Sequence, residues 1–413
     1  MNVFGPTDIL LPRVESMEKW AVIACDQFTS QPEYWQRVRE YVGDAPSTLR
    51  LVLPEAELGE NDDARAAQIH AEMTKLLDSG RFAVCFNAMI YVERTLLSGK
   101  VRKGLVGAVD LEAYDYAAGS VSPIRASEKT VVERIPPRKK VRDGAPLELP
   151  HVLLLCDDDE RLLIEPIAAI RDSLPQLYAF DLMEGGGHVA GWLVQGEAAE
   201  AFERRLAAYA RTADGKYEGL NGASVLFAVG DGNHSLATAK ACYEDQKRAC
   251  SPEEAAKLPS RWALVELENI HDEAQAFEPI HRLVLTEDAD ALLRRMREEI
   301  GAEEGYPVTW YAGERSGTIF LDKRKGPLPV GVLQAFLDAY MAEHPCGIDF
   351  IHGEDALRQL AAREGAVGLA LPAIDKGGLF RGIVADGVLP RKSFSMGHAQ
   401  EKRYYIEARQ IQK

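Results

Sequence analysis

A short hydrophobic segment near the middle of this sequence ends at two closely spaced glycines, and an alanine-rich segment follows directly. Residues 224–229 read Ser-Val-Leu-Phe-Ala-Val, and residues 236–248 have the composition and apolar spacing of a helix. Between them stands the hexapeptide Gly-Asp-Gly-Asn-His-Ser at 230–235. Because glycine adopts the backbone angles of tight turns at little steric cost, the pattern predicts a buried strand, a sharp turn and a helix.

This turn is the first candidate site, because the start of a helix offers free N–H groups and a positive dipole end to an anion. Asp231 is suited to holding a metal-bound water or accepting a substrate hydroxyl, and His234 to contacting a phosphate or moving a proton. The structural alternative is that Asp231 fixes the turn and Ser235 caps the helix. We favour the functional interpretation, in which the other ligand-binding candidates of the turn are Gly230, Gly232, Asn233 and Ser235.

Strand-like and helix-like segments alternate along the rest of the chain. Residues 62–77 have helical spacing, whereas residues 82–92 and 103–110 are typical of strands. Residues 177–183 and 188–194 flank Glu-Gly-Gly-Gly, a pattern that predicts a β-hairpin. The expected fold class is therefore α/β, in the form of an α+β mixed sheet.

The length of the chain predicts two lobes. At 413 residues it exceeds the size at which a single hydrophobic core stops growing. A new cycle of helices and strands begins shortly after residue 283. We predict a main α/β domain over residues 1–283, which carries the turn, and a smaller C-terminal α/β lobe over residues 284–413.

Composition and charge exclude several classes of protein. A hydrophobic fraction of 46% indicates a packed core rather than general disorder. The net charge of −16 disfavours the coating of nucleic acid, which depends on accumulated lysine and arginine. The sequence has no apolar run long enough to span a membrane, no start resembling a signal peptide, and six scattered cysteines without metal-ligand spacing. We therefore expect a cytoplasmic protein without nucleic-acid or membrane partners.

The second candidate site is a basic island over residues 124–142 of an otherwise acidic chain. Arg125 and Arg138 are its candidate phosphate-binding residues, and Glu128 is a candidate base for a hydroxyl proton. Such a concentration of charge suits a phosphorylated ligand, because phosphoryl transfer is catalysed mainly by positioning and charge neutralisation. The alternative is a solvated loop that neutralises acidic neighbours.

The third candidate is the C-terminal segment 391–398, which reads Arg-Lys-Ser-Phe-Ser-Met-Gly-His. Lys392 and Ser393 are suited to contacting a phosphate, and His398 to completing a site with the turn. The segment lacks the glycine loop of a Walker motif. A surface loop is the alternative interpretation.

Asp26 and four of the histidines have no assigned role. Asp26 lies at a predicted strand-to-helix junction, where turn chemistry and a ligand contact are equally open. His70, His151, His188 and His352 have no partner that spacing along the chain identifies.

Five motifs carry a family resemblance. The turn at 230–235 resembles a D-G-H-H-R segment, and residues 104–114 resemble G-x-x-x-x-x-D-L-x-x-Y. Three others occur in the same order: residues 127–130 resemble H-E-x-T, residues 279–282 match P-x-H-R, and residues 389–393 resemble M-P-x-K-S-T. Together they resemble the bacterial and archaeal family called domain of unknown function 1015, over most of the chain.

The turn and the H-E-x-T segment depart from this family pattern at three positions. Asn233 replaces the first histidine of the turn, Ser235 replaces its arginine, and Ser127 replaces the histidine of H-E-x-T. Loss of the arginine puts a phosphate clamp at the turn in doubt, unless a nearby arginine or lysine takes its place.

The D-G-H-H-R element also resembles one in the ParB/sulfiredoxin-like fold, which includes nucleotide-dependent free-serine kinases and nucleotide-hydrolysing ParB proteins. This resemblance implies a ParB/sulfiredoxin-like core and phosphoryl transfer from a nucleotide to a small hydroxylated, serine-like metabolite. Mg²⁺ would travel on the nucleotide, near Asp231. In this hypothesis Glu128 is the base, Asp231 orients the hydroxyl or metal, and the phosphate charge is stabilised by His234 and Lys392.

Two other functions stay open. One is a non-catalytic regulatory protein that binds a nucleotide or a phosphorylated metabolite. The other is a metal-independent hydrolase that uses Asp231 and His234 on a water, although no G-x-S-x-G elbow supports it. The sequence does not identify the acceptor, the nucleotide or the oligomeric state. Nor does it show that residues 125–142, 230–235 and 391–398 converge in space.

Overall fold

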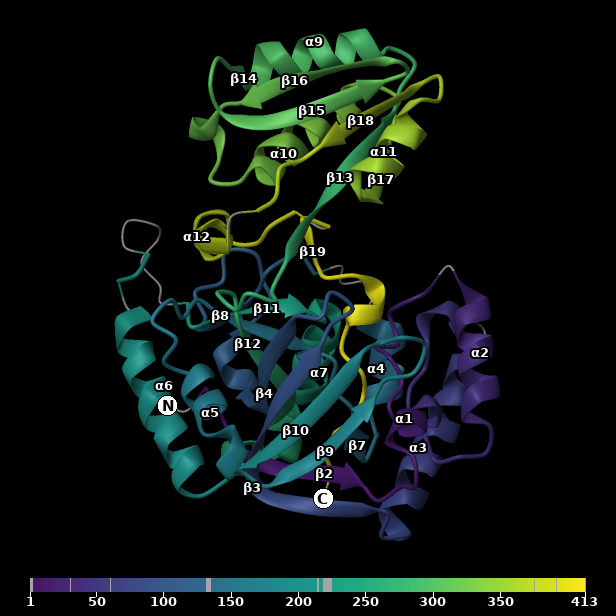
Figure 1. The fold of residues 1–413 in the computed structure, drawn as a ribbon, viewed down its shortest axis with the longest axis vertical. Coiled ribbons are helices and arrows are strands. Elements are labelled where there is room, and N and C mark those ends of the chain that lie inside the picture. Colours follow the sequence, from purple (N-terminus) through teal and green to yellow (C-terminus); the bar gives the residue numbers. More distant parts are fainter. Residues whose placement is uncertain are drawn as a thin grey trace. The chain divides into compact units, whose positions relative to one another are not determined.

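A computed structural model describes residues 3–29, 31–59, 61–130, 135–213, 215–217, 225–374, 376–390 and 392–412 (Figure 1). Contacts divide the described chain into two compact units. The first unit takes in the residues up to 217, residues 225–275, and residues 398–412. The second unit takes in residues 276–397. Each unit combines helices with a mixed sheet, which confirms the predicted α/β fold class.

The first unit is built on a sheet of eleven strands among the described residues. β6 (Ile124–Ala126) and β11 (Phe227–Asp231) run parallel, whereas β8 (Leu153–Cys156) runs antiparallel to β11. The path of the sheet is β5-β6-β11-β8-β12-β4-β3-β10-β9, with β1 on β4 and β2 on β3. The other strands are β1 (Phe4–Gly5), β2 (Thr7–Pro12), β3 (Phe82–Thr95), β4 (Val101–Asp110), β5 (Tyr114–Asp115), β9 (Gln176–Asp181), β10 (His188–Val194) and β12 (Trp262–Asn269).

Both faces of this sheet are buried, each under its own hydrophobic core. Successive residues of a strand point to opposite faces, so they contribute to the two cores in turn. In β3, Met89 and Tyr91 belong to one hydrophobic core, and Ile90 and Val92 belong to a second. Figure 1 shows α6 to the left of the sheet and α2 and α3 to its right. The helices of this unit are α1 (Met17–Trp20), α2 (Pro32–Val42), α3 (Asp62–Asp78), α4 (Ile135–Arg142), α5 (Glu165–Ala169), α6 (Glu197–Ala213), α7 (Asn233–Arg248) and α8 (Pro252–Ala255).

The locally predicted elements are present. The strand, turn and helix that the two glycines punctuate are β11 and α7. The helix predicted at 62–77 is α3, and the strands predicted at 82–92 and 103–110 are β3 and β4. The predicted hairpin is β9 and β10, which pair antiparallel.

The C-terminal segment 398–412 belongs to the first unit, contrary to the predicted division at residue 284. β20 (Arg409–Gln410) pairs with β7 (Leu147–Glu148), and bridges join Ala408 to Leu10 and Tyr404 to Ile23. Buried ion pairs hold the same segment: Arg403 binds Glu266 and Glu407, and Arg409 binds Glu148. The segment therefore returns to the first unit after the chain has built the second.

The second unit begins at residue 276 rather than 284. The predicted boundary cuts β13 (Phe277–Leu285), whose described partners β17, β18 and β19 all lie in this unit. Its sheet follows β14-β16-β15-β18-β13-β17. The remaining elements are β14 (Gly301–Ala302), β15 (Tyr306–Ala312), β16 (Arg315–Leu321), β17 (Gly347–His352), β18 (Ala366–Ala370), β19 (Phe394–Met396), α9 (Ala289–Ile300), α10 (Pro329–Glu343), α11 (Glu354–Ala361) and α12 (Lys376–Asp386).

Among the described residues, no helix has the length and apolar character that crossing a membrane requires.

Candidate active site at the end of strand β11

Three chain segments meet at one edge of the first unit's sheet, where β11 ends. In the parallel pair, Val229 of β11 lies opposite Ala126 of β6. Asp231 and Glu128 each follow two residues later, so both stand at the carboxyl edge of this strand pair. In the antiparallel pair, Asp231 lies opposite Leu153, and His151 precedes that residue by two. The turn, the half-buried Glu128 and His151 therefore share an edge, which is where open α/β sheets bind ligands.

Asp231 forms an ion pair with Lys402, which comes from the returning C-terminal segment. Their Oδ2 and Nζ atoms are 3.2 Å apart, and the side chains are 20% and 10% exposed. The other carboxylate oxygen of Asp231 accepts the N–H of Gly232 at 3.0 Å. A carboxylate and an ammonium are thus placed together at the first turn of α7.

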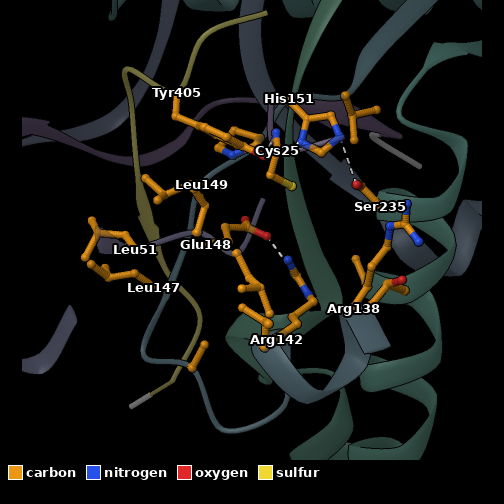
Figure 2. A pocket seen from close by; sticks show the side chains of 18 of the residues that line it. Cys25, Leu51, Arg138, Arg142, Leu147, Glu148, Leu149, His151, Ser235 and Tyr405 are labelled. Carbon is orange, nitrogen blue, oxygen red and sulfur yellow. Dashed lines mark hydrogen bonds and ion pairs between the residues drawn. The ribbon is translucent and has the colours of Figure 1, made fainter. Parts of the chain in front are cut away.

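His151 joins this turn to the N-terminal segment of the chain. Its Nε2 lies 3.0 Å from Ser235 Oγ, and its Nδ1 lies 2.8 Å from the Tyr405 hydroxyl (Figure 2). The same Nε2 is 3.8 Å from Asp26 Oδ2. The Tyr405 hydroxyl also accepts the N–H of Cys25 at 3.2 Å. Asp26 therefore faces the His151 ring, which also contacts the turn through Ser235.

The charges around Asp26 keep it ionised. Burial favours the neutral acid, but His151, a hydrogen bond from Gln27, and the charges of Lys402 and Arg138 outweigh it and lower the pKa of Asp26. Burial, reinforced by the negative charge of Asp26, raises the pKa of the Cys25 thiol to about 11. The site therefore presents carboxylates beside a lysine, next to a neutral thiol.

Comparison with known proteins identifies the family. Residues 10–406 match the family described as protein of unknown function DUF1015. The chain belongs to this family. No curated protein sequence matches the DUF1015 chain significantly.

Solved structures resemble the DUF1015 chain only distantly. SbnI with C-terminal truncation from Staphylococcus aureus has 11% identity and a TM-score of 0.36, over 71% of this chain and 82% of that one. A free serine kinase in complex with AMP has 12% identity and a TM-score of 0.34, over 72% and 92%. A conserved hypothetical protein from Pyrococcus furiosus has 11% identity and a TM-score of 0.33, over 72% and 95%. TM-scores below 0.5 carry no inference about function, and the ParB/sulfiredoxin-like core stays a prediction.

Of the three departures from the family pattern at the turn and at residue 127 of this DUF1015 chain, two contact each other. Asn233 Oδ1 accepts the N–H of Ser127 at 3.2 Å, and Asn233 Nδ2 donates to Ser127 Oγ at 3.3 Å. The third, Ser235, contacts His151. Lys402 supplies a cation at the turn, where the family pattern has the arginine that Ser235 replaces.

The other predicted residues of the first unit lie in varied surroundings. His234 is half-buried in the first turn of α7. Arg125 is buried, its Nε donates to the carbonyl of Ser122 at 3.0 Å, and burial lowers its pKa. Arg138 forms an ion pair with Glu55, and its charge acts on Asp26. The N–H of His398 donates to Glu401 Oε2 at 3.0 Å, directly before Lys402.

Lys392 and Ser393 belong to the second unit. The carbonyl of Lys392 accepts Arg282 Nη1 at 2.9 Å, and Ser393 Oγ donates to the carbonyl of Pro390 at 2.6 Å. Both contacts organise the local backbone of that unit. Their approach to the turn remains a prediction, and Arg391 lies outside the described residues.

Sequence reasoning missed Lys402, Tyr405 and the partners of His151. Lys402 stands in Glu-Lys-Arg-Tyr-Tyr at 401–405, where two aromatic residues follow two cations. That mixture of aromatic and charged residues was the available signal for a buried polar segment. For His151 no signal exists, because its partners at 26, 235 and 405 are distant along the chain.

Replacing Gly232 with alanine is expected to destabilise the turn more than a positive φ alone explains. Gly232 has φ +80°, and an added Cβ would lie 3.1 Å from Val152 Cα. Gly99 has the same φ, and a Cβ there would meet no described atom within 4 Å. We expect roughly 1–2 kcal/mol of destabilisation for Gly99→Ala and at least ~1 kcal/mol more for Gly232→Ala, measured by urea unfolding. Equal losses would show that the turn tolerates the extra atom.

Replacing Asp26 with asparagine is expected to flatten the acid limb of the stability profile. The pKa of Asp26 is lower in the folded state than its ordinary value of 3.8, so its carboxylate stabilises the protein above that value. This contribution is lost as the pH falls through the folded-state pKa. Melting temperatures of the two proteins should therefore converge below about pH 4 and differ most near neutrality. A constant difference across this range would contradict the charged contacts of Asp26.

Proposed function

We propose that this chain transfers a phosphoryl group from a nucleotide to a hydroxyl group of a small metabolite. The observation that carries the proposal is the pairing of Asp231 with Lys402 at the first turn of α7, with Asp26 and His151 beside them. Phosphoryl transfer needs cations and N–H groups that hold phosphate, and carboxylates that hold a metal ion or a hydroxyl. This edge of the sheet supplies both kinds of group, from segments that are distant along the chain.

The residues are assigned roles by their chemistry and position. Lys402 and the N-terminus of α7 bind phosphate oxygens, with His234 nearby in the same turn. Asp231 orients the hydroxyl or the metal ion. Glu128, which follows β6 at the same edge, accepts the hydroxyl proton. His398, which lies in the same unit, is proposed as a further phosphate-binding residue.

The residues present suit a metal ion that arrives with the nucleotide. The described residues contain no group of three or more His, Cys, Asp or Glu side chains arranged to hold a resident metal. Mg²⁺ usually takes one or two protein carboxylates and completes its shell with phosphates and water. Asp231 and Asp26 are the carboxylates that would hold it, and when bound it would neutralise charge on the phosphates.

The proposed transfer needs no reactant besides the nucleotide and the acceptor alcohol. The acceptor oxygen forms a new bond to the terminal phosphorus, and its proton passes to Glu128. The bond between that phosphorus and the bridging oxygen breaks, and the remainder of the nucleotide leaves with the electron pair. Lys402 and the N–H groups of α7 stabilise the negative charge that spreads over the phosphoryl oxygens.

One observation favours a second candidate, a hydrolase. Ser235 Oγ and His151 Nε2 are 3.0 Å apart, within the reach that a nucleophile and its base require. This pair differs from the predicted Asp231 and His234. Nucleotide-independent hydrolysis of small esters, lost in Ser235→Ala, would favour this candidate over phosphoryl transfer. Saturable nucleotide binding without turnover would instead favour a regulatory binding protein.

A thermal-shift screen tests the proposal. Purified protein is mixed with ATP, ADP, GTP, CTP or pyrophosphate, each with and without Mg²⁺, because a ligand of the native state raises the melting temperature. We expect one nucleotide to give a Mg²⁺-dependent shift that Asp231→Asn loses. The matched control is Asp172→Asn, whose side chain is 91% exposed in the same unit. Phosphoryl transfer to acceptors is then measured, with serine as the first. A screen without any shift at millimolar nucleotide would overturn the proposal.

A further inference from the structure

A cavity of about 140 Å³ lies in the first unit, next to the candidate site. Its wall includes α4 and α7 and the segments 51–53 and 147–149 (Figure 2). Protein interiors are close-packed and contain few voids larger than a water molecule. An apolar cavity of about 150 Å³ admits a molecule the size of benzene. The volume therefore suits a ligand with on the order of six non-hydrogen atoms.

The two ends of the cavity differ in chemistry. Leu51, Leu147 and Leu149 form an apolar side, as Figure 2 shows. At the other end lie the hydroxyls of Ser235 and Tyr405, with the His151 ring between them. Cys25 lines this end as well, and its raised pKa keeps it a neutral thiol. A ligand would therefore meet apolar carbon on one side and hydrogen-bonding side chains on the other.

The charged groups of the lining are paired with one another. Arg142 binds Glu148 at 2.5 Å, and Glu148 also accepts Arg409 Nε at 2.6 Å. Arg138 is paired with Glu55. A ligand that carries its own charges would lose their hydration inside the cavity without gaining a new counter-ion, which is costly. The lining therefore favours an uncharged ligand over a zwitterion.

We propose that this cavity binds a small, uncharged alcohol or phenol, with its apolar body against the leucines and its hydroxyl at the Ser235 and His151 end. Ser235 is in the same first turn of α7 that Asp231 precedes. A hydroxyl held there lies beside the proposed phosphate site. Insofar as this alcohol is the phosphoryl acceptor, the inference rests on the proposed function. It then changes the acceptor class from serine-like to apolar.

The test is direct binding, measured by ligand-observed NMR and calorimetry on the full chain. The probes are phenol and 3-methylbutan-1-ol, compared with serine and benzoate. We expect saturable binding of both alcohols, at least tenfold tighter than binding of serine or benzoate. Serine that binds as tightly as phenol, or alcohols that do not saturate, would overturn the inference.

Two variants locate the binding. Leu149→Phe adds volume to the apolar side, and Ser235→Ala removes a hydroxyl from the polar end; each should weaken phenol binding at least tenfold. Leu97→Phe, at a side chain that is exposed, is the control and should bind phenol as the parent does. Unchanged phenol affinity in both test variants would place the ligand elsewhere and overturn the inference.

The nucleotide screen separates this inference from the proposed function. A Mg²⁺-dependent nucleotide shift without alcohol binding would overturn the cavity assignment and leave phosphoryl transfer standing. Alcohol binding without any nucleotide shift would support the cavity and overturn the proposed function. Phosphorylation of an apolar alcohol in preference to serine would support both.

Discussion

Replacing Arg403 with alanine is expected to lower the free energy of unfolding of the first unit by about 3–5 kcal/mol, because it leaves buried charges without their partner. The Arg403 side chain is 4% exposed and lies 2.7 Å from both Glu266 and Glu407. Its Nη1 also donates to the carbonyls of Pro150 and Tyr404, at 3.1 and 3.0 Å. Removal of the guanidinium leaves two buried carboxylates and two carbonyls to be desolvated without compensation.

The measurement exploits the distribution of tryptophan. Four of the five tryptophans lie in the first unit, and Trp310 lies in the second. In a Trp310→Phe background, fluorescence-monitored urea unfolding therefore reports the first unit alone. The control is Arg204→Ala, whose side chain is 67% exposed beside Glu200 and should change stability by less than ~0.5 kcal/mol. A loss below about 1 kcal/mol for Arg403→Ala would contradict the role of this buried network in holding the C-terminal segment.

Replacing Lys402 with methionine is expected to weaken ATP binding by roughly 10–100-fold and to leave adenosine binding unchanged. This prediction follows from the proposed contact between Lys402 and phosphate, because a hydrogen bond to a charged group contributes about 1.5–3 kcal/mol. Methionine retains much of the apolar length of lysine and removes the ammonium group, with its charge and its hydrogen-bond donors. Calorimetric titration with ATP, ADP and adenosine measures the dependence on phosphate.

A double variant separates binding from stability. Lys402→Met leaves Asp231 without its cation 3.2 Å away, so the single variant should also lose stability. Asp231→Asn combined with Lys402→Met removes both charges and should regain part of that stability without regaining ATP binding. Recovery of ATP affinity in the double variant would show that Lys402 acts only as the partner of Asp231. Equal losses for ATP and adenosine would show that it supports the fold rather than a phosphate.

The elements that could be predicted are those with a strong local pattern. β11 and α7 follow from apolar runs interrupted by glycine, and β9 and β10 from a glycine-rich turn between two apolar segments. The family could be predicted for a similar reason, since its motifs are short and follow a set order along residues 10–406. The turn was also recognisable as a place where polar side chains gather at a helix start.

The division into units illustrates where local patterns stop being informative. A new series of predicted helices and strands near residue 284 suggested a domain boundary there. β13 nevertheless crosses that position as one continuous strand. The return of residues 398–412 to the first unit has no local signal, because it depends on pairing with strands at the other end of the chain. Buried ion pairs such as Arg409 with Glu148 are likewise invisible until the backbone brings them together.

The α/β class, the family and the strand-turn-helix element whose strand ends at Asp231 could all be predicted from the amino-acid sequence. Those conclusions depend on the spacing of neighbouring residues, which the chain carries locally. The side chains that surround that aspartate became known only from the folded chain. Lys402 reaches Asp231, and His151 meets Ser235 and Tyr405, because β8 runs antiparallel to β11 and the C-terminal segment pairs with residues 22–24. Electrostatic contacts depend on distance in space, and separation along the chain does not reveal that distance.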